Sequence, residues 1–343
     1  MHALEHATEI SLPDQRVAVL GDVHGNIGWL RMLARALPYL APDVTTILQL
    51  GDWWMPPTEV DEAFAETNTT AIYVTNGNHE PWDKITPLLD QHPGEAVRVS
   101  DITWLLPRPA RLTIGGRSVL SLGGASSVDR VSRQEGLTWW PDEAITDEHV
   151  AAGIAGGPAD LMLTHESPAN TPVRPVQKLL RTNPHWFTKA ALEASVASRA
   201  RVSQVWDAVR PELLIRGHMH VAGGGQTDDG RRVASLGRDG NEWNLGILDM
   251  QTFGWQRRVS PSSADWRTAK LPASLVRSES TAPQKPCTRA SWTDSSRHLV
   301  PSVMPRTTST VSAVSRRYSK RSAGATLEPA TMSLDRGEAP PFR

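Results

Sequence analysis

Residues 17–26 read VAVLGDVHGN, an apolar run that ends at a glycine and an aspartate. A short apolar run bounded by such residues is typical of a buried strand. The following segment places apolar side chains three or four residues apart from Ile27 to Leu37, which is the spacing of an amphipathic helix. The stretch therefore predicts a strand, a turn and a helix, with Asp22 and His24 on the turn.

The same pattern recurs along the chain. Four further apolar runs end at a polar or metal-ligating residue, at 45–50, 71–76, 161–164 and 212–217. Other apolar segments predict strands over 118–124, 231–237 and 243–250, the later ones with hairpin character, and one or two helices over 185–209. Alternating strands and helices predict an α/β protein, in which ligands bind beyond the carboxyl ends of the strands. We therefore expect these polar strand ends to form one site.

Composition restricts the chemistry of that site. The chain has 343 residues, 36 Lys and Arg against 37 Asp and Glu, and a single cysteine, Cys287. One cysteine forms neither an intramolecular disulfide nor a thiolate zinc site, so a metal would need His, Asp, Glu or Asn ligands. No signal peptide is apparent, and no uncharged apolar run approaches the ~20 residues of a membrane span. We expect a soluble, cytoplasmic protein without membrane contact.

Charge and composition change near residue 260. Residues 260–343 hold 13 Lys and Arg against 6 Asp and Glu and are rich in Ser, Thr, Pro, Arg and Ala, whereas residues 1–259 carry a net charge of −8. Such a composition buries too little apolar surface to offset chain entropy. The sequence predicts a folded domain over 1–259 and a disordered basic tail over 260–343. A terminus produced by a frame shift would have a similar amino-acid composition.

The residues at the strand ends form a set of oxygen and imidazole ligands. They are Asp22 and His24 in GDVHGN, Asp52 in GDWW, Asn78 in GNHE, His165 in THES, and His218 and His220 in GHMH. This set suits Mn, Fe, Zn, Ni or Co better than a thiolate-selective ion. It exceeds what one tetrahedral ion needs, but two ions that share a carboxylate would use all of it. A lone histidine or a single GHMH is more often a surface turn, so the prediction rests on the five blocks together.

These five ordered blocks resemble the calcineurin-like metallophosphoesterase superfamily, in particular its bacterial and phage branch, over residues 16–258. The resemblance implies an α/β fold in which a two-sheet sandwich is flanked by helices in four αββα layers. It implies that Asp52 bridges two metal ions and that His79 is a general acid or transition-state stabiliser, with Glu80 as a supporting group. It implies a first metal on Asp22, His24 and His220, and a second on Asn78, His165 and His218.

One departure concerns the substrate. The branches of the family that continue the second block as GDxVDRG use its arginine on the substrate phosphate, but here Asp52 is followed by Trp-Trp-Met-Pro-Pro. This difference disfavours a Ser/Thr protein phosphatase. Guanidinium groups suit phosphate oxygens, and the candidates to replace the missing arginine are Arg130, Arg133 and Arg216, each of which could equally form a surface ion pair.

The resemblance predicts a binuclear metal-dependent phosphoester hydrolase, in which a metal-activated water or hydroxide attacks phosphorus in line. Asp52 and His79 are its predicted catalytic residues. The alternatives are a nuclease-like or cyclic-nucleotide phosphodiesterase, and a weakly active binding scaffold with the same fold. The predicted partner is a phosphoester substrate. Nucleic acid stays open as a partner but is not indicated, since residues 1–259 carry a net charge of −8 and show no groove of clustered Lys and Arg. The sequence predicts neither the natural substrate nor the oligomeric state.

Overall fold

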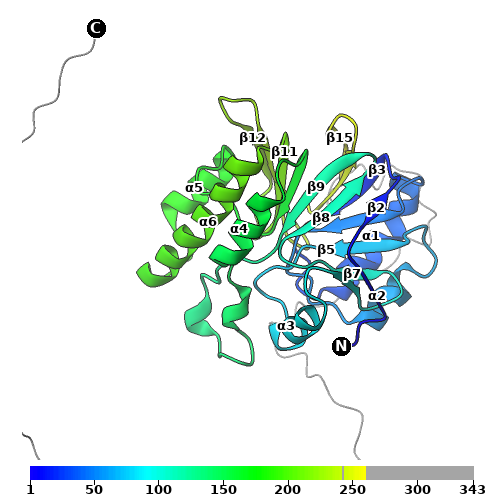
Figure 1. Ribbon diagram of the computed structural model, residues 1–343, viewed down its shortest axis with the longest axis horizontal. Helices are drawn as coiled ribbons and strands as arrows, with labels where there is room; N and C mark the ends of the chain where they lie inside the picture. Colours follow the sequence, from blue (N-terminus) through cyan, green and yellow to red (C-terminus); the bar gives the residue numbers. More distant parts are fainter. Residues whose placement is uncertain (242, 260–343) are drawn as a thin grey trace, which may run out of the picture. The chain divides into compact units, whose positions relative to one another are not determined.

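The computed structural model describes residues 1–241 and 243–259, with side chains described as far as residue 255. These residues form two β-sheets that share a core and carry helices on their outer faces (Figure 1). The predicted four-layer α/β sandwich is confirmed. The predicted tail over 260–343 lies outside the described residues.

The first sheet has eight strands, and its centre is parallel. In spatial order they are β1 (Glu5–Ala7), β6 (Ala96–Arg98), β7 (Thr103–Leu105), β5 (Ala71–Val74), β4 (Thr46–Gln49), β3 (Arg16–Leu20), β14 (Leu245–Asp249) and β15 (Trp255–Val259). Strand β4 lies parallel to both β3 and β5. The carboxyl ends of these three strands therefore meet at one edge of the sheet.

The second sheet has seven strands. In spatial order they are β12 (Gly223–Gln226), β13 (Arg232–Ser235), β11 (Leu213–Arg216), β10 (Leu161–Thr164), β9 (Arg117–Leu122), β8 (Ala110–Ile114) and β2 (Ser11–Leu12). Strand β10 is parallel to β9 and β11. Both β10 and β11 are buried along their whole length, as continuous apolar runs in parallel sheets usually are.

The two faces of each central strand pack into different cores. Val17 and Val19 of β3 lie in a cluster with Leu161 and Leu163 of β10, which fills the space between the sheets. Ala18 of β3, by contrast, belongs to the cluster under the helices of the first sheet. This alternation follows from the two-residue period of a strand.

Six α-helices cover the outer faces in the described chain. Helices α1 (Ile27–Leu40), α2 (Pro57–Phe64) and α3 (Trp82–Gln91) pack on the first sheet, and α4 (Asp147–Ala155), α5 (Arg174–Thr182) and α6 (Lys189–Val209) on the second (Figure 1). Short 3₁₀ turns lie at Arg130–Ser132 and Pro141–Glu143. Asn26 starts α1, because its side chain accepts a hydrogen bond from the Trp29 amide. The helix predicted after the first strand is thus confirmed, and 185–209 contains one helix rather than two.

The predicted hairpin near the end of the domain is wrong in its pairing. The strands exist, but β13 belongs to the second sheet and β14 to the first. The connecting loop crosses between the sheets, and the Asn244 side chain fixes it by donating to the carbonyls of Asp22 and Gly237, both at 3.0 Å. The antiparallel partners of β14 are β3 and β15.

The chain divides into two units, Met1–Thr281 and Ala282–Arg343. The second unit lies wholly outside the described residues. Among the helices that the structure describes, none is long and apolar enough to cross a membrane.

Candidate metal centre

The predicted metal ligands follow five strands that end at the same side of the sandwich. Asp22 and His24 follow β3, Asp52 follows β4, Asn78 follows β5, His165 follows β10, and His218 and His220 follow β11. Contacts join the two sheets here, since the His218 amide donates to Asp22 Oδ2 at 3.0 Å. All seven predicted ligands are linked by contacts at this edge, which is the placement that the strand pattern predicts.

One group of four ligands is compact. One ligand atom each of Asp22, His24, Asp52 and His220 lies within 4.8 Å of the others. His220 Nε2 is 3.1 Å from Asp22 Oδ2, and His24 Nε2 is 3.4 Å from Asp52 Oδ2. These are the residues that the family resemblance implies for the first ion, together with the bridging carboxylate.

The remaining ligands gather on the other side of Asp52. His165 Nε2 lies 2.9 Å from Asn78 Oδ1 and 3.2 Å from Asp52 Oδ1. The His218 ring is centred 5.0 Å from the His165 ring. Asp52 therefore presents Oδ2 to the first group and Oδ1 to the second.

The glycine before each of three ligands is required by close packing. A Cβ at Gly51 would collide with the His165 ring, one at Gly77 with Asp52, and one at Gly217 with the Asp22 carboxylate. This explains why the motifs read Gly-Asp, Gly-Asn and Gly-His. Sterics at these positions, in addition to ligand chemistry, select the sequence.

Four predicted ligands adopt left-handed backbone conformations. The φ angle is 52° at His24 and Asp52, 66° at His218 and 53° at His220. Such angles are uncommon for residues other than glycine and cluster at functional sites, where the surrounding structure compensates the strain. Their concentration at one edge supports a functional role for this cluster.

Hydrogen bonds orient two of the imidazoles. His165 Nδ1 lies 2.6 Å from the Leu50 carbonyl oxygen, which can only accept, so Nδ1 donates and Nε2 faces the cluster. His24 Nδ1 lies 3.0 Å from Asp239 Oδ1, and its Nε2 faces Asp52. A carboxylate or carbonyl behind a histidine is the usual support of a metal ligand. Sequence reasoning missed Asp239, which lies in the loop between β13 and β14 without a motif to mark it.

The arrangement of acceptors fits a cation. Because Nδ1 of His165 carries a proton, a neutral ring would point its Nε2 lone pair at two oxygens, those of Asn78 and Asp52. In addition, Asp52 Oδ2 is buried and accepts no hydrogen bond from any described residue. Converging acceptors of this kind need a proton or a metal ion between them. The oxygen and imidazole donors suit divalent transition ions.

The pKa values of these residues indicate where a proton would lie between the converging acceptors if no metal ion were bound. Burial lowers the pKa of His165, but the Asp52 carboxylate outweighs it and raises this pKa to about 9. For His24, burial is likewise outweighed, by the nearby carboxylates of Asp239 and Asp52, and the pKa rises to about 10. Burial opposes the charge of Asp52, yet the neighbouring imidazoles hold its pKa well below the usual value.

His79 lies beside this cluster. Its ring centroid is 6.1 Å from that of His24, and its backbone amide donates to Asp52 Oδ1 at 2.9 Å. Arg133 Nη2 lies 3.1 Å from His79 Nε2, and since arginine only donates, the imidazole proton resides on Nδ1. Burial, partly opposed by Asp52, lowers the pKa of His79, so the ring is neutral near pH 7.

The three candidate arginines lie in different places. Arg133 contacts His79 and forms a 2.7 Å ion pair with Asp129. Arg130 is exposed and stacks over the Trp139 ring at 3.6 Å. Arg216 is fully buried and donates to the Gly217 carbonyl, so we no longer expect it to contact a substrate. Of the three, only Arg133 adjoins a predicted catalytic residue.

Two buried carboxylates brace the loops around the centre. Glu80 accepts hydrogen bonds from the backbone amides of Trp53, Trp54 and Gly77 and thereby ties the loop after β4 to the loop after β5. Glu143 accepts a 2.6 Å bond from Ser127 Oγ, which itself accepts from Asn78 Nδ2. This second chain turns Asn78 Oδ1 toward His165.

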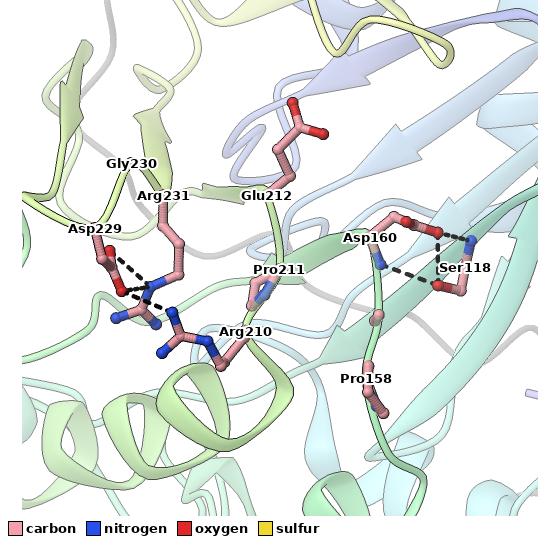
Figure 2. A pocket seen from close by; sticks show the side chains of 10 residues that line it. Ser118, Pro158, Asp160, Arg210, Pro211, Glu212, Asp229, Gly230 and Arg231 are labelled. Carbon is pink, nitrogen blue, oxygen red and sulfur yellow. Dashed lines mark hydrogen bonds and ion pairs between the residues drawn. The ribbon is translucent and has the colours of Figure 1, made fainter.

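A groove of about 440 Å³ lies at the opposite ends of the second sheet's strands (Figure 2). Ser118 and Asp160 line one side of it, and Arg210, Asp229 and Arg231 the other. Asp229 forms ion pairs with both arginines, and Asp160 accepts a hydrogen bond from Ser118. We assign no chemistry to this groove.

A family model described as calcineurin-like phosphoesterase matches residues 15–222, more than half of the chain. The chain belongs to the calcineurin-like phosphoesterase family. It is accordingly a phosphoester hydrolase by family, and the structure contains a group of residues able to bind a metal. The bacterial and phage branch stays a prediction. A comparison with curated proteins gives no match.

Solved structures of low sequence identity resemble the fold. The protein TT1561 of Thermus thermophilus matches with a TM-score of 0.43 and 12% identity over 72% of this chain and 98% of its own. A dimetal phosphatase from Danio rerio matches with a TM-score of 0.43 and 11% identity, over 69% and 93%. An archaeal phosphodiesterase matches with a TM-score of 0.36 and 13% identity, over 71% and 98%. At these scores the assignment rests on the family model.

Proposed function

We propose that this phosphoester hydrolase uses two metal ions, held on either side of Asp52. The observation that carries the proposal is that the two Asp52 oxygens face different groups of ligands, with His24 on one side and His165 on the other. Asp22, His24 and His220 would hold one ion, and Asn78, His165 and His218 the other. Bound ions would supply Lewis acidity toward phosphoryl oxygens and lower the pKa of a coordinated water. Mn, Fe, Zn, Ni and Co all suit these donors.

The chain's own residues would bind and orient the substrate. Arg133 can donate to a phosphoryl oxygen while Asp129 and His79 hold its guanidinium in place. His79 is neutral and carries its proton on Nδ1, a buried atom without a partner among the described residues. A neutral imidazole donates a hydrogen bond to the leaving oxygen, and full proton transfer requires the substrate's negative charge to raise the pKa of the ring.

The extent of the catalytic unit is part of the proposal. The strand β14 that holds Asn244 near Asp22 belongs to the first sheet, so the unit must extend beyond the 15–222 span of the family match. We propose that residues 1–259 form it.

An activity panel tests the proposed function. Protein stripped with a chelator should be inactive and should recover turnover when Mn, Zn, Ni, Co or Fe is added, with about two ions bound at this metal centre. The panel comprises p-nitrophenyl phosphate, bis-p-nitrophenyl phosphate, nucleotides, cyclic nucleotides and DNA. Preference for diesters would favour a phosphodiesterase. Two bound ions without turnover of any substrate would instead identify a binding scaffold and contradict the proposal.

Asp239 should support catalysis through His24. Replacing Asp239 with asparagine removes the charge behind His24 Nδ1, so the imidazole becomes a weaker ligand and loses its fixed orientation. We expect metal affinity or kcat/KM to fall by about 10–100-fold. Metal titration and kinetics on the variant measure the effect, and Asp229→Asn in the distant groove is the matched control. Unchanged affinity and rate in Asp239→Asn would contradict this support.

A further inference from the structure

A second cluster of metal-ligating side chains lies outside the metal centre. His6 belongs to the edge strand β1, and His92 and Glu95 lie in the turn between α3 and β6. Strands β7 and β5 separate β6 from β4, which leads to Asp52. The family motifs account for none of these three residues.

The three side chains converge on one point. His6 Nδ1 lies 2.8 Å and His92 Nδ1 3.5 Å from the same oxygen, Glu95 Oε2. The two rings stack with centroids 4.6 Å apart and planes inclined by 29°. One ligand atom from each residue lies within 4.8 Å of the other two. Tetrahedral zinc with bonds of about 2.0–2.2 Å holds its ligand atoms about 3.4 Å apart, so small side-chain shifts would admit the ion.

A tight turn preorganises two of the ligands. In His92-Pro-Gly-Glu95 the Glu95 amide donates to the His92 carbonyl at 3.1 Å. Pro93 occupies the second position and Gly94, with φ of 78°, the third, which is the sequence signature of a type II turn. The turn therefore places His92 and Glu95 side by side at its two ends before any ligand binds.

Strand pairing brings the third ligand to this turn. His6 pairs with Val97 of β6, two residues after Glu95, in an antiparallel ladder of three pairs. The Leu4 amide donates to the Arg98 carbonyl at 2.7 Å, and Glu5 forms an ion pair with Arg98 at 3.2 Å. Because β1 has so few ladder contacts, a further link between His6 and the turn would add substantially to its attachment.

The donor chemistry selects the ion. Two imidazoles and one carboxylate form a ligand set that zinc uses in proteins, with solvent at the fourth position. The side chains of His92 and Glu95 are each 23% exposed and that of His6 is 54% exposed, so solvent can reach the cluster. We propose that His6, His92 and Glu95 form a zinc-binding site, separate from the metal centre, that fastens β1 to the first sheet.

The test compares the zinc content of variants of the full chain. Wild type, His6→Ala, His92→Ala and Glu95→Gln are dialysed against the same buffered free zinc and analysed by mass spectrometry for bound metal. We expect each variant to hold one zinc per chain fewer than wild type. His185→Ala, which replaces an exposed histidine elsewhere, should match wild type. Asp52→Asn should keep this zinc even if the metal centre is lost, which separates the two sites.

Backbone hydrogen exchange provides the second measurement. Zinc should slow exchange of the amides in β1 in wild type and leave it unchanged in His6→Ala. Retained phosphoesterase activity and an unchanged circular dichroism spectrum show that each variant is folded. Equal zinc content in wild type and all three variants, or exchange in β1 that does not respond to zinc, would overturn the proposal and leave the cluster as a His6–Glu95 ion pair.

Discussion

Replacement of Asp52 with asparagine is expected to lower kcat/KM by at least about 10³-fold for every phosphoester, as loss of a central electrostatic group at a metal site does. Asparagine has nearly the same shape but carries no charge. Asp52 is fully buried, and its two oxygens lie 3.4 Å from His24 Nε2 and 3.2 Å from His165 Nε2. Under the proposal, this one substitution weakens both ion sites, so the loss should not depend on the leaving group.

The same substitution should change the metal-free protein. Asp52 is a principal cause of the raised pKa values of His24 and His165, which reach about 10 and about 9. These pKa values should fall toward the ordinary range in Asp52→Asn. A raised folded pKa stabilises the fold fully below the ordinary histidine pKa of 6.5, so wild-type apoprotein should lose this contribution as the pH rises from there through about 9 and 10. The loss should be smaller in the variant, in which Asp239 still raises the pKa of His24.

Metal analysis, steady-state kinetics and urea unfolding of the apoprotein at several pH values check this prediction. Asp43→Asn is a suitable control, because Asp43 is largely exposed and pairs only with Arg16 among the contacts described. If the variant keeps two tightly bound ions and slows hydrolysis by less than about tenfold, Asp52 does not bridge the two ions.

The sequence predicts the central strands and the metal cluster for one physical reason. Apolar runs such as 161–164 are buried on both faces, and a polar residue directly after such a run must lie at the sheet edge. His165 directly follows the run 161–164, so its place at this edge of the sheet could be predicted from the sequence alone. The roles of the ligands came from the family resemblance rather than from spacing.

Other features depend on contacts between distant segments, which no local pattern reports. Asp239 meets His24 only because the loop after β13 crosses from one sheet to the other. The same crossing explains why the predicted hairpin is wrong, since two apolar runs close in sequence look alike whether they pair or separate. Arg216 resembled a phosphate ligand because of its place before GHMH, but it ends a strand that is buried throughout.

Replacement of His79 with alanine is expected to slow hydrolysis of alkyl phosphoesters by about 10²–10⁴-fold, the usual contribution of acid–base or electrostatic assistance at a leaving group. Hydrolysis of p-nitrophenyl esters should slow far less, because their leaving group departs without assistance. The metal content should stay at the wild-type level. His79 Nε2 is engaged by Arg133, so we do not expect this nitrogen to bind a metal ion.

The pKa of His79 sharpens this expectation. Burial and the Arg133 charge lower it, against the opposing effect of Asp52, so the free enzyme holds a neutral ring above mildly acidic pH. The rate on alkyl esters should therefore rise as the pH falls, down to the point where the metal ligands protonate, because a larger fraction of His79 can transfer a proton. This rise should be absent in His79→Ala and weak for p-nitrophenyl esters of the wild type. Kinetics on both ester types and metal analysis, with Asp52→Asn for comparison, distinguish a role at the leaving group from metal binding. Equal slowing of both esters, or loss of metal, would show that His79 is a metal ligand or a structural residue.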